Sequence, residues 1–246
     1  MFELLLSLLE SKPHIVEHFR NTFTLDILLK IFEDYHDEDL KLSAVDTISQ
    51  LCKQDSTGEI IFLFRKLGGT QKIINQLSSS SDQNTIMSIL VCMQSLTNDD
   101  QDILVEFNDL NVVQIMLEFL QSYRSFPIMI CQILSCLTNL ALNDQINIKI
   151  RLHGAHIIGT ILMDNCPVLI KDKLVREEKE KQGKQIIQYS KDLNEDIKTK
   201  HEIQLHCLRT LRFLYSVEKN RKSFKLVFPP EIFGSFIDIG NFNKNF

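Results

Sequence analysis

Residues 136–162 read CLTNLALNDQINIKIRLHGAHIIGTIL, and this stretch decides the fold. A helix-like run is followed by a polar break, a second run, a His-Gly-Ala corner and a third run. Such a stretch is either a single local motif or one copy of a unit that builds the whole chain. The answer determines whether an active site or a binding surface is to be expected.

The helix before this corner has an apolar stripe that recurs along the chain. With the i, i+3, i+4, i+7 spacing of an amphipathic helix, the stripe consists of Ile130, Ile133, Leu134, Leu137 and Leu140. The residues 44 positions earlier are all apolar: Ile86, Ile89, Leu90, Met93 and Leu96. Another 45 positions earlier, four of five are apolar: Lys41, Ala44, Val45, Ile48 and Leu51. At 71 positions later the last three match, in the set His201, Gln204, Leu205, Leu208 and Leu211.

A stripe that recurs every ~40–47 residues is typical of armadillo and HEAT arrays. Each stripe is followed by a short helix-like piece, at 59–67, 101–107, 145–152 and 220–228. A corner comes next, at 68–69, 108–109, 153–154 and 229–230, and then a second apolar run, at 73–77, 112–120, 157–163 and 232–239. Three helices per unit favour armadillo over two-helix HEAT units. The sequence therefore predicts an all-α, armadillo-type right-handed α-solenoid of about four and a half repeats.

This prediction divides the chain into six segments. We expect a truncated first repeat at 1–35, repeats at 36–80, 81–124 and 125–165, a charged insertion at 166–200, and a last repeat with the start of a C-terminal connection at 201–246. The insertion alternates Lys and Glu, which indicates a solvated or disordered excursion, with a regulatory insert as the alternative. The apolar start MFELLLSLLES resembles the last helix of a unit, so we expect the sequence to be a fragment or an incomplete gene model.

Composition excludes several classes of protein. The 246 residues carry a net charge of -5, which argues against a general nucleic-acid binder. No run approaches the ~18 apolar residues of a membrane span, and Glu3 with no basic segment argues against a signal peptide. The six Cys contain no C-x-x-C pair and most lie among apolar residues, which predicts free thiols in a reducing compartment. We therefore expect neither a nucleic-acid nor a membrane partner.

No motif for catalysis, a cofactor or a metal stands out. His153 and His156 form H-x-x-H at the corner, but a third and fourth zinc ligand with supporting spacing are missing. The acidic run at 32–39 lacks the central Gly and closing Glu of an EF-hand. The chain contains neither a P-loop nor the glycine loop, V-A-I-K, H-R-D and D-F-G motifs of a kinase. We predict that this chain is not an enzyme and has no cofactor.

The remaining candidate is the concave groove that the third helices of an armadillo array line. In some family members an Asn there hydrogen-bonds the backbone of an extended peptide, and Asn139 occupies that position. Its counterparts in the other repeats are Gln50, Ser95 and Thr210, so these four are the candidate partner-binding residues. The alternative is that they are ordinary solvent-facing polar residues. The absence of Trp differs from the paired Trp and Asn ladders of importin-type proteins, which argues against nuclear-import cargo.

The stretch 208–242, LRTLRFLYSVEKNRKSFKLVFPPEIFGSFIDIGNF, carries a sharper resemblance. Its L-R-x-L-R-F-L helix, E-x-N-R-K-x-F-K helix and F-I-D-I-G ending resemble the armadillo segment that precedes the catalytic domain in the NIMA-related serine/threonine kinases. That family is associated with cilia and signalling, so the resemblance implies a cytoplasmic or ciliary location. No position matches the family's catalytic residues.

Two functions follow as expectations. The first is a non-catalytic interaction and regulatory region of a NIMA-related kinase, whose partner is a protein or peptide or the kinase domain of the same full-length protein. The second is a free-standing armadillo adaptor that binds peptides or proteins in its groove. An enzyme in its own right would require activity from this chain alone.

Overall fold

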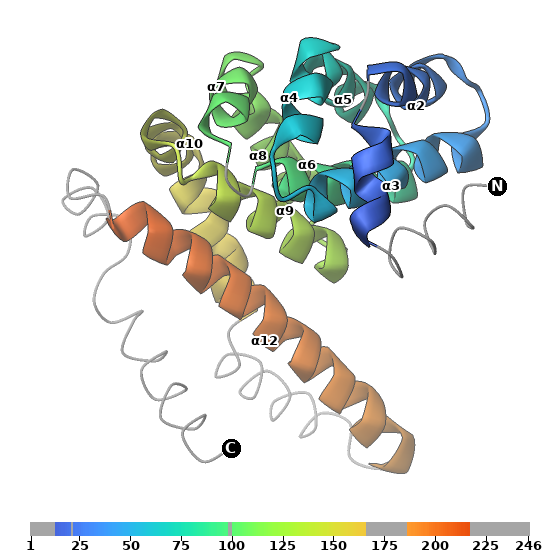
Figure 1. The fold of residues 1–246 in the computed structure, drawn as a ribbon. Coiled ribbons are helices and arrows are strands. Elements are labelled where there is room, and N and C mark those ends of the chain that lie inside the picture. Colours follow the sequence, from blue (N-terminus) through green and yellow to red (C-terminus); the bar gives the residue numbers. More distant parts are fainter. Residues whose placement is uncertain (1–12, 21, 98–99, 166–185, 217–246) are drawn as a thin grey trace. The chain divides into compact units, whose positions relative to one another are not determined.

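The computed structural model describes residues 13–20, 22–97, 100–165 and 186–216, and all regular structure in these ranges is helical (Figure 1). The all-α prediction is confirmed for this part of the chain. The elements before residue 97 are η1 (Pro13–Phe19), α2 (Thr22–Asp34), α3 (Glu38–Gln54), α4 (Glu59–Lys66), α5 (Gly69–Ser79) and α6 (Gln83–Leu96). Those after it are α7 (Gln101–Asp109), α8 (Val112–Ser122), α9 (Pro127–Leu140), α10 (Asp144–Asp164) and α12 (Ile186–Ser216).

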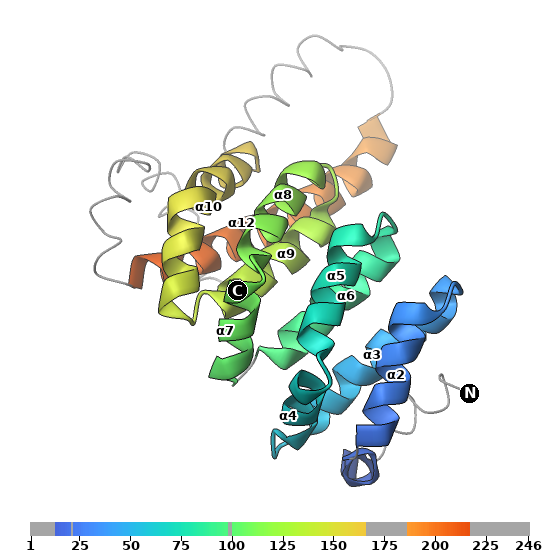
Figure 2. The same ribbon diagram turned by 90° about the horizontal axis from the view of Figure 1, so that it is seen from above.

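Contacts divide the chain into two compact units. The first consists of Met1–Met116 and Ser135–Ile146, and the second of Leu117–Leu134 and Asn147–Phe246. Within the first unit, α2 and α5 form one layer and α3 and α6 form another (Figure 2). The α3 and α6 helices pack extensively against each other, because each presents the predicted stripe.

Burial confirms the predicted stripe in three helices. All five stripe residues of α6 and all five of α9 are buried, as are the four apolar ones of α3. Lys41, the polar member in α3, lies at the edge and pairs with Glu38. Asp37 and Asp82 cap α3 and α6 by accepting hydrogen bonds from the backbone N–H of Leu40 and Thr85. Steps of 45 and 44 residues therefore relate three equivalent helices.

Two of the corners between helices contain a residue with a left-handed backbone conformation. Gly68, between α4 and α5, has φ +72°, a conformation that strains an L side chain, so glycine at this predicted corner has its physical reason. The next corner lies at Asn111 (φ 56°), between α7 and α8, two residues beyond the end of the predicted pair 108–109. Asn tolerates this region better than other non-glycine residues.

The predicted corner at His153-Gly154 is wrong. The α10 helix continues through both residues to Asp164, and His153 is exposed on it. Glycine inside a helix costs about 1 kcal/mol relative to Ala, so it weakens a helix without ending it. Gly154 has a packing role instead, since a Cβ there would lie 2.7 Å from Cδ2 of Leu117 in the same unit.

The predicted register of the last stripe is also wrong, by three residues. In α12 the buried residues are Ile203, Gln204, Cys207, Thr210, Leu211 and Leu214. They match the buried positions of α9 at a step of 74 rather than 71, with Ile203 equivalent to Met129 and Leu214 to Leu140. Leu205, expected in the core, is 48% exposed. The Cys-Leu pair at 207–208 repeats the letters of 136–137 but has a different position in the packing.

An ion pair recurs between successive repeats of the first unit. The Nη2 of Arg20 lies 2.8 Å from Oδ1 of Asp55, and 45 residues later the Nη1 of Arg65 lies 3.9 Å from Oδ1 of Asp100. Both aspartates also accept hydrogen bonds from the backbone N–H groups that begin the following helix, α4 or α7. The same pair of residue types therefore joins one repeat to the next.

Several predicted features lie outside the described residues. These are the apolar start at 1–11, most of the 166–200 insertion, the final helices and corner at 220–239, and most of the 208–242 resemblance. Residues 186–200 of the expected insertion belong to α12. The repeat boundaries remain predictions.

Candidate functional site

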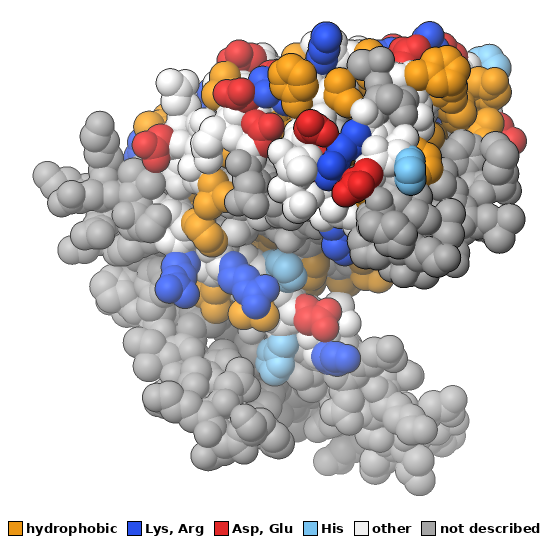
Figure 3. Space-filling view, in the orientation of Figure 1, with side chains coloured by type: hydrophobic (Ala, Val, Ile, Leu, Met, Phe, Trp, Pro, Cys, Tyr) orange, Lys and Arg blue, Asp and Glu red, His pale blue; other side chains and the backbone are white. Residues whose placement is uncertain are grey.

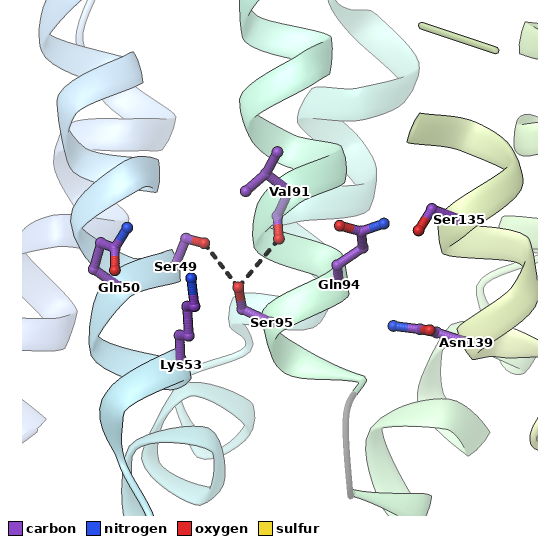
Figure 4. A pocket seen from close by; sticks show the side chains of 8 residues that line it. All are labelled: Ser49, Gln50, Lys53, Val91, Gln94, Ser95, Ser135 and Asn139. Carbon is purple, nitrogen blue, oxygen red and sulfur yellow. Dashed lines mark hydrogen bonds between the residues drawn. The ribbon is translucent and has the colours of Figure 1, made fainter. Parts of the chain in front are cut away.

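Three of the four predicted partner-binding residues line one hollow of the first unit. Gln50 on α3, Ser95 on α6 and Asn139 on α9 occupy equivalent positions on adjacent helices. Together with Ser49, Lys53, Val91, Gln94 and Ser135 they enclose about 350 Å³ (Figure 4). The shared register of the three helices therefore places their polar side chains side by side.

Thr210 does not belong with them. Its side chain is fully buried, and its hydroxyl donates to the carbonyl oxygens of His206 and, at 3.2 Å, of Leu134. A fully buried threonine cannot line an exposed groove. The error comes from the three-residue shift in register, which makes Thr210 equivalent to Cys136 rather than to Asn139.

Some polar groups of the hollow hold the helices together. The hydroxyl oxygens of Ser49 and Ser95 lie 2.9 Å apart and link α3 to α6. The amide of Asn139 donates to the hydroxyl of Thr97 at 3.3 Å, and the Cys136 thiol donates to the Leu90 carbonyl at 3.2 Å. These bonds position the walls of the hollow, and Ser95, only 8% exposed, is part of the wall rather than of its surface.

Other polar groups are available to a partner. The side-chain amides of Gln50 and Gln94 and the ammonium of the exposed Lys53 make no hydrogen bond or ion pair with any described residue. Figure 4 shows their side chains on either side of the Ser49–Ser95 bond. A primary amide offers both a donor and an acceptor, which is the pair of groups that a peptide backbone presents. The hollow is therefore suited to an extended polypeptide.

An acidic residue lies one turn from the hollow. Asp46 precedes Gln50 by four residues on α3. Burial raises the pKa of Asp46, although a hydrogen bond with Ser88 opposes this change. The charges along this face of α3 are therefore a carboxyl at one end and the Lys53 ammonium at the other.

Neither a metal-binding cluster nor an activated thiol is present among the described residues. No three of their His, Cys, Asp or Glu side chains lie close enough together to hold a metal ion. Cys52, Cys92, Cys136 and Cys207 are buried free thiols, and burial raises the pKa of each. The partly exposed Cys131 has a pKa raised to about 11 by burial and by the charge of Glu202. Thiols that remain protonated near neutral pH are poor nucleophiles.

Among the described helices, none combines the length and the apolar character that a membrane crossing requires.

Lys53, Gln94 and Ser135 were not predicted from the sequence. Each lies on the same helix as a predicted residue, within four positions of it: Lys53 beside Gln50, Gln94 beside Ser95, and Ser135 beside Asn139. Residues three and four apart share one helix face, so extending each predicted position by one turn identifies Lys53 and Ser135. This rule does not identify Gln94, which is adjacent to Ser95 in sequence and is recognised as a lining residue only from the structure.

No protein-family model matches this chain. A 43-residue segment is 49% identical to serine/threonine-protein kinase Nek10 of Mus musculus and 46% identical to Nek10 of Homo sapiens. A 42-residue segment is 43% identical to a serine/threonine-protein kinase of Caenorhabditis elegans. The matches to the two Nek10 proteins cover 18% of this chain and 4% of the length of each kinase. The chain thus shares a short local similarity with kinases of the NIMA-related type.

Proposed function

We propose that this chain is a non-catalytic, armadillo-type interaction and regulatory region that belongs to a NIMA-related serine/threonine kinase. The observation that carries the proposal is the alignment of Gln50, Ser95 and Asn139 in one polar hollow on three equivalent helices. The short similarity to Nek10 supports the link to a kinase. In this proposal the helices form a right-handed solenoid.

The mechanism that we propose is the capture of an extended peptide. The amides of Gln50 and Gln94 would pair with the peptide's backbone groups, and Lys53 would bind an acidic side chain or a backbone carbonyl at the edge of the hollow. The walls have internal hydrogen bonds that hold α3, α6 and α9 in place, so the ordering cost of binding is confined to the side chains of Gln50, Gln94 and Lys53. The bound segment would come from a protein partner or from the kinase domain of the same full-length protein, in the cytoplasm or at a cilium.

The first experiment is to sequence the transcript beyond the codon for Phe246. A continuing frame that encodes a Gly-rich loop, a V-A-I-K-type lysine and an H-R-D motif would support the regulatory region of a kinase. A stop codon would contradict that part of the proposal and favour the alternative, a free-standing armadillo adaptor with the same hollow.

The hollow is tested separately, with the encoded catalytic domain as the titrated protein. We expect Gln50→Ala combined with Gln94→Ala to weaken binding roughly ten-fold or more, since each truncation removes hydrogen bonds to the peptide worth about 1 kcal/mol. Gln71→Ala combined with Asn75→Ala is the matched control, because these exposed residues on α5 bond only to each other. Equal binding by both double variants would exclude the hollow as the docking site.

A further inference from the structure

Two arginines of α12 have no carboxylate partner among the described residues, whereas three arginines elsewhere do. Arg20, Arg65 and Arg124 each pair with a carboxylate, at 2.8 Å from Asp55, 2.9 Å from Glu106 and 2.7 Å from Asp164. Arg209 and Arg212 are exposed and make no hydrogen bond or ion pair with any described residue. They therefore present about ten unshared N–H donors to the surroundings (five per guanidinium).

The packing of α12 places these two arginines on one exposed face. The hydrogen bond from the Thr210 hydroxyl to the Leu134 carbonyl fixes α12 against α9, with Cys207 and Leu211 buried beneath it. Residues three or four positions apart share one side of a helix. The surface that we call the arginine face consists of Leu205, Arg209, Arg212 and Phe213. Leu205 is 48% and Phe213 38% exposed, so apolar surface accompanies the charge. Basic, acidic, histidine and apolar side chains all follow the described part of α12 in Figure 3.

Other titratable side chains near the arginine face determine where positive and negative charge lie along α12. Glu202 lies seven residues before Arg209, and burial lowers the pKa of His206, as does the charge of Arg209, while Glu202 opposes this shift. His206 is thus mostly neutral at pH 7, and the positive charge of this part of α12 is concentrated at Arg209 and Arg212. Glu202 would repel an acidic ligand at the other end.

We propose that the arginine face of α12 binds an acidic peptide that carries one apolar side chain. Carboxylates would accept bidentate hydrogen bonds from Arg209 and Arg212, and the apolar side chain would lie on Leu205 and Phe213. The exposed apolar side chains of Leu205 and Phe213 favour a peptide with an apolar side chain over nucleic acid. This proposal concerns the second unit and does not depend on the hollow of the first.

The test uses the full chain and a short fluorescein-labelled peptide in which glutamates flank one leucine. We expect binding by fluorescence anisotropy that weakens as salt increases, since exposed charge pairs are screened. Arg209→Gln and Arg212→Gln should each reduce the affinity roughly ten-fold, because each removes a charge-assisted, bidentate hydrogen-bonding partner of a carboxylate. A control peptide with glutamine in place of glutamate should bind the wild-type chain no more tightly than the glutamate peptide binds the two arginine variants.

Two control variants show whether the loss of affinity is specific to the arginine face. Arg124→Gln removes the same charge from an exposed arginine that already has the partner Asp164, and it should retain wild-type affinity. Gln50→Ala with Gln94→Ala should also retain it, which separates this site from the hollow.

Circular dichroism identifies any variant that fails to fold, and Arg209→Lys then serves as a milder substitution, with partial loss of affinity expected. Equal affinity of Arg209→Gln, Arg212→Gln and wild type would overturn the proposal. Tighter binding of single-stranded DNA than of the peptide would overturn it as well.

Discussion

At the scale of single residues, Asp55 has two structural roles at once. Its carboxylate accepts hydrogen bonds from the backbone N–H of Ile60 at 2.7 Å and from the hydroxyl of Thr57 at 2.7 Å, and it pairs with Arg20. Burial opposes its charge, but these hydrogen bonds outweigh burial and hold the pKa of Asp55 below its ordinary value. One side chain therefore both caps α4 and links it to Arg20, the residue that follows η1.

We predict that Asp55→Asn destabilises the protein by roughly 1–3 kcal/mol at pH 7, because a hydrogen-bonded charge is lost while Asn still caps the helix. A lowered folded-state pKa stabilises the protein above the unfolded value of about 3.9, and this contribution disappears as pH falls through the folded pKa. Urea unfolding at pH 7 and in strong acid should therefore show a difference between wild type and variant that shrinks with acidification. Asp109→Asn, at an exposed position, should change stability by less than about 0.5 kcal/mol. A difference that stays constant with pH would contradict the role of the charge.

At the scale of elements, α12 shows how a repeat can be recognised in sequence and still be placed wrongly. The letters Cys-Leu recur at 136–137 and 207–208, but the helix packs with Ile203, Cys207, Leu211 and Leu214 inward. Several registers of an amphipathic helix satisfy a short apolar pattern, since a shift of three residues rotates the apolar stripe by only about 60°. Packing against the neighbouring helix determines which register forms. In α12 the Thr210–Leu134 hydrogen bond contributes to this selection.

Two leucines distinguish the registers by experiment. Leu211 is 3% exposed, so Leu211→Ala should cost roughly 2–5 kcal/mol of unfolding free energy. Leu205→Ala should cost less than about 1 kcal/mol, because nearly half of this side chain already contacts solvent. Both variants are compared by thermal and urea unfolding. Equal losses would favour the 71-residue register, which places both leucines in the core.

At the scale of the whole molecule, the two contact units give perturbations a limited range. In a stacked array each repeat contacts mainly its neighbours, so a local defect weakens nearby helices more than distant ones. Leu137 is fully buried in the α9 stripe and belongs, with α3 and α6, to the first unit.

We predict that Leu137→Ala accelerates amide hydrogen exchange chiefly in α6 and the adjoining part of α9, with a smaller effect in α2, the more distant helix of the first unit. The physical reason is a local cavity, with an overall cost of roughly 2–5 kcal/mol. Hydrogen-exchange mass spectrometry of wild type and variant measures this directly, and Leu142→Ala, at a 46%-exposed position, is the matched control. Uniform acceleration in every helix would indicate a single cooperative unit instead.

The sequence by itself determined the helical class, the 44- and 45-residue steps, the glycine corner at Gly68 and three members of the hollow. These follow from local rules, since periodicity and glycine's conformational freedom act within a few turns of chain. Only the tertiary structure decided that α10 passes straight through Gly154, that α12 is shifted by three residues so that Thr210 is buried, and that Lys53, Gln94 and Ser135 complete the hollow. Each of these outcomes depends on the side chains of another helix, as Leu117 packs against Gly154. Local sequence leaves several conformations and registers nearly equal in free energy, and packing against a neighbouring helix selects one of them.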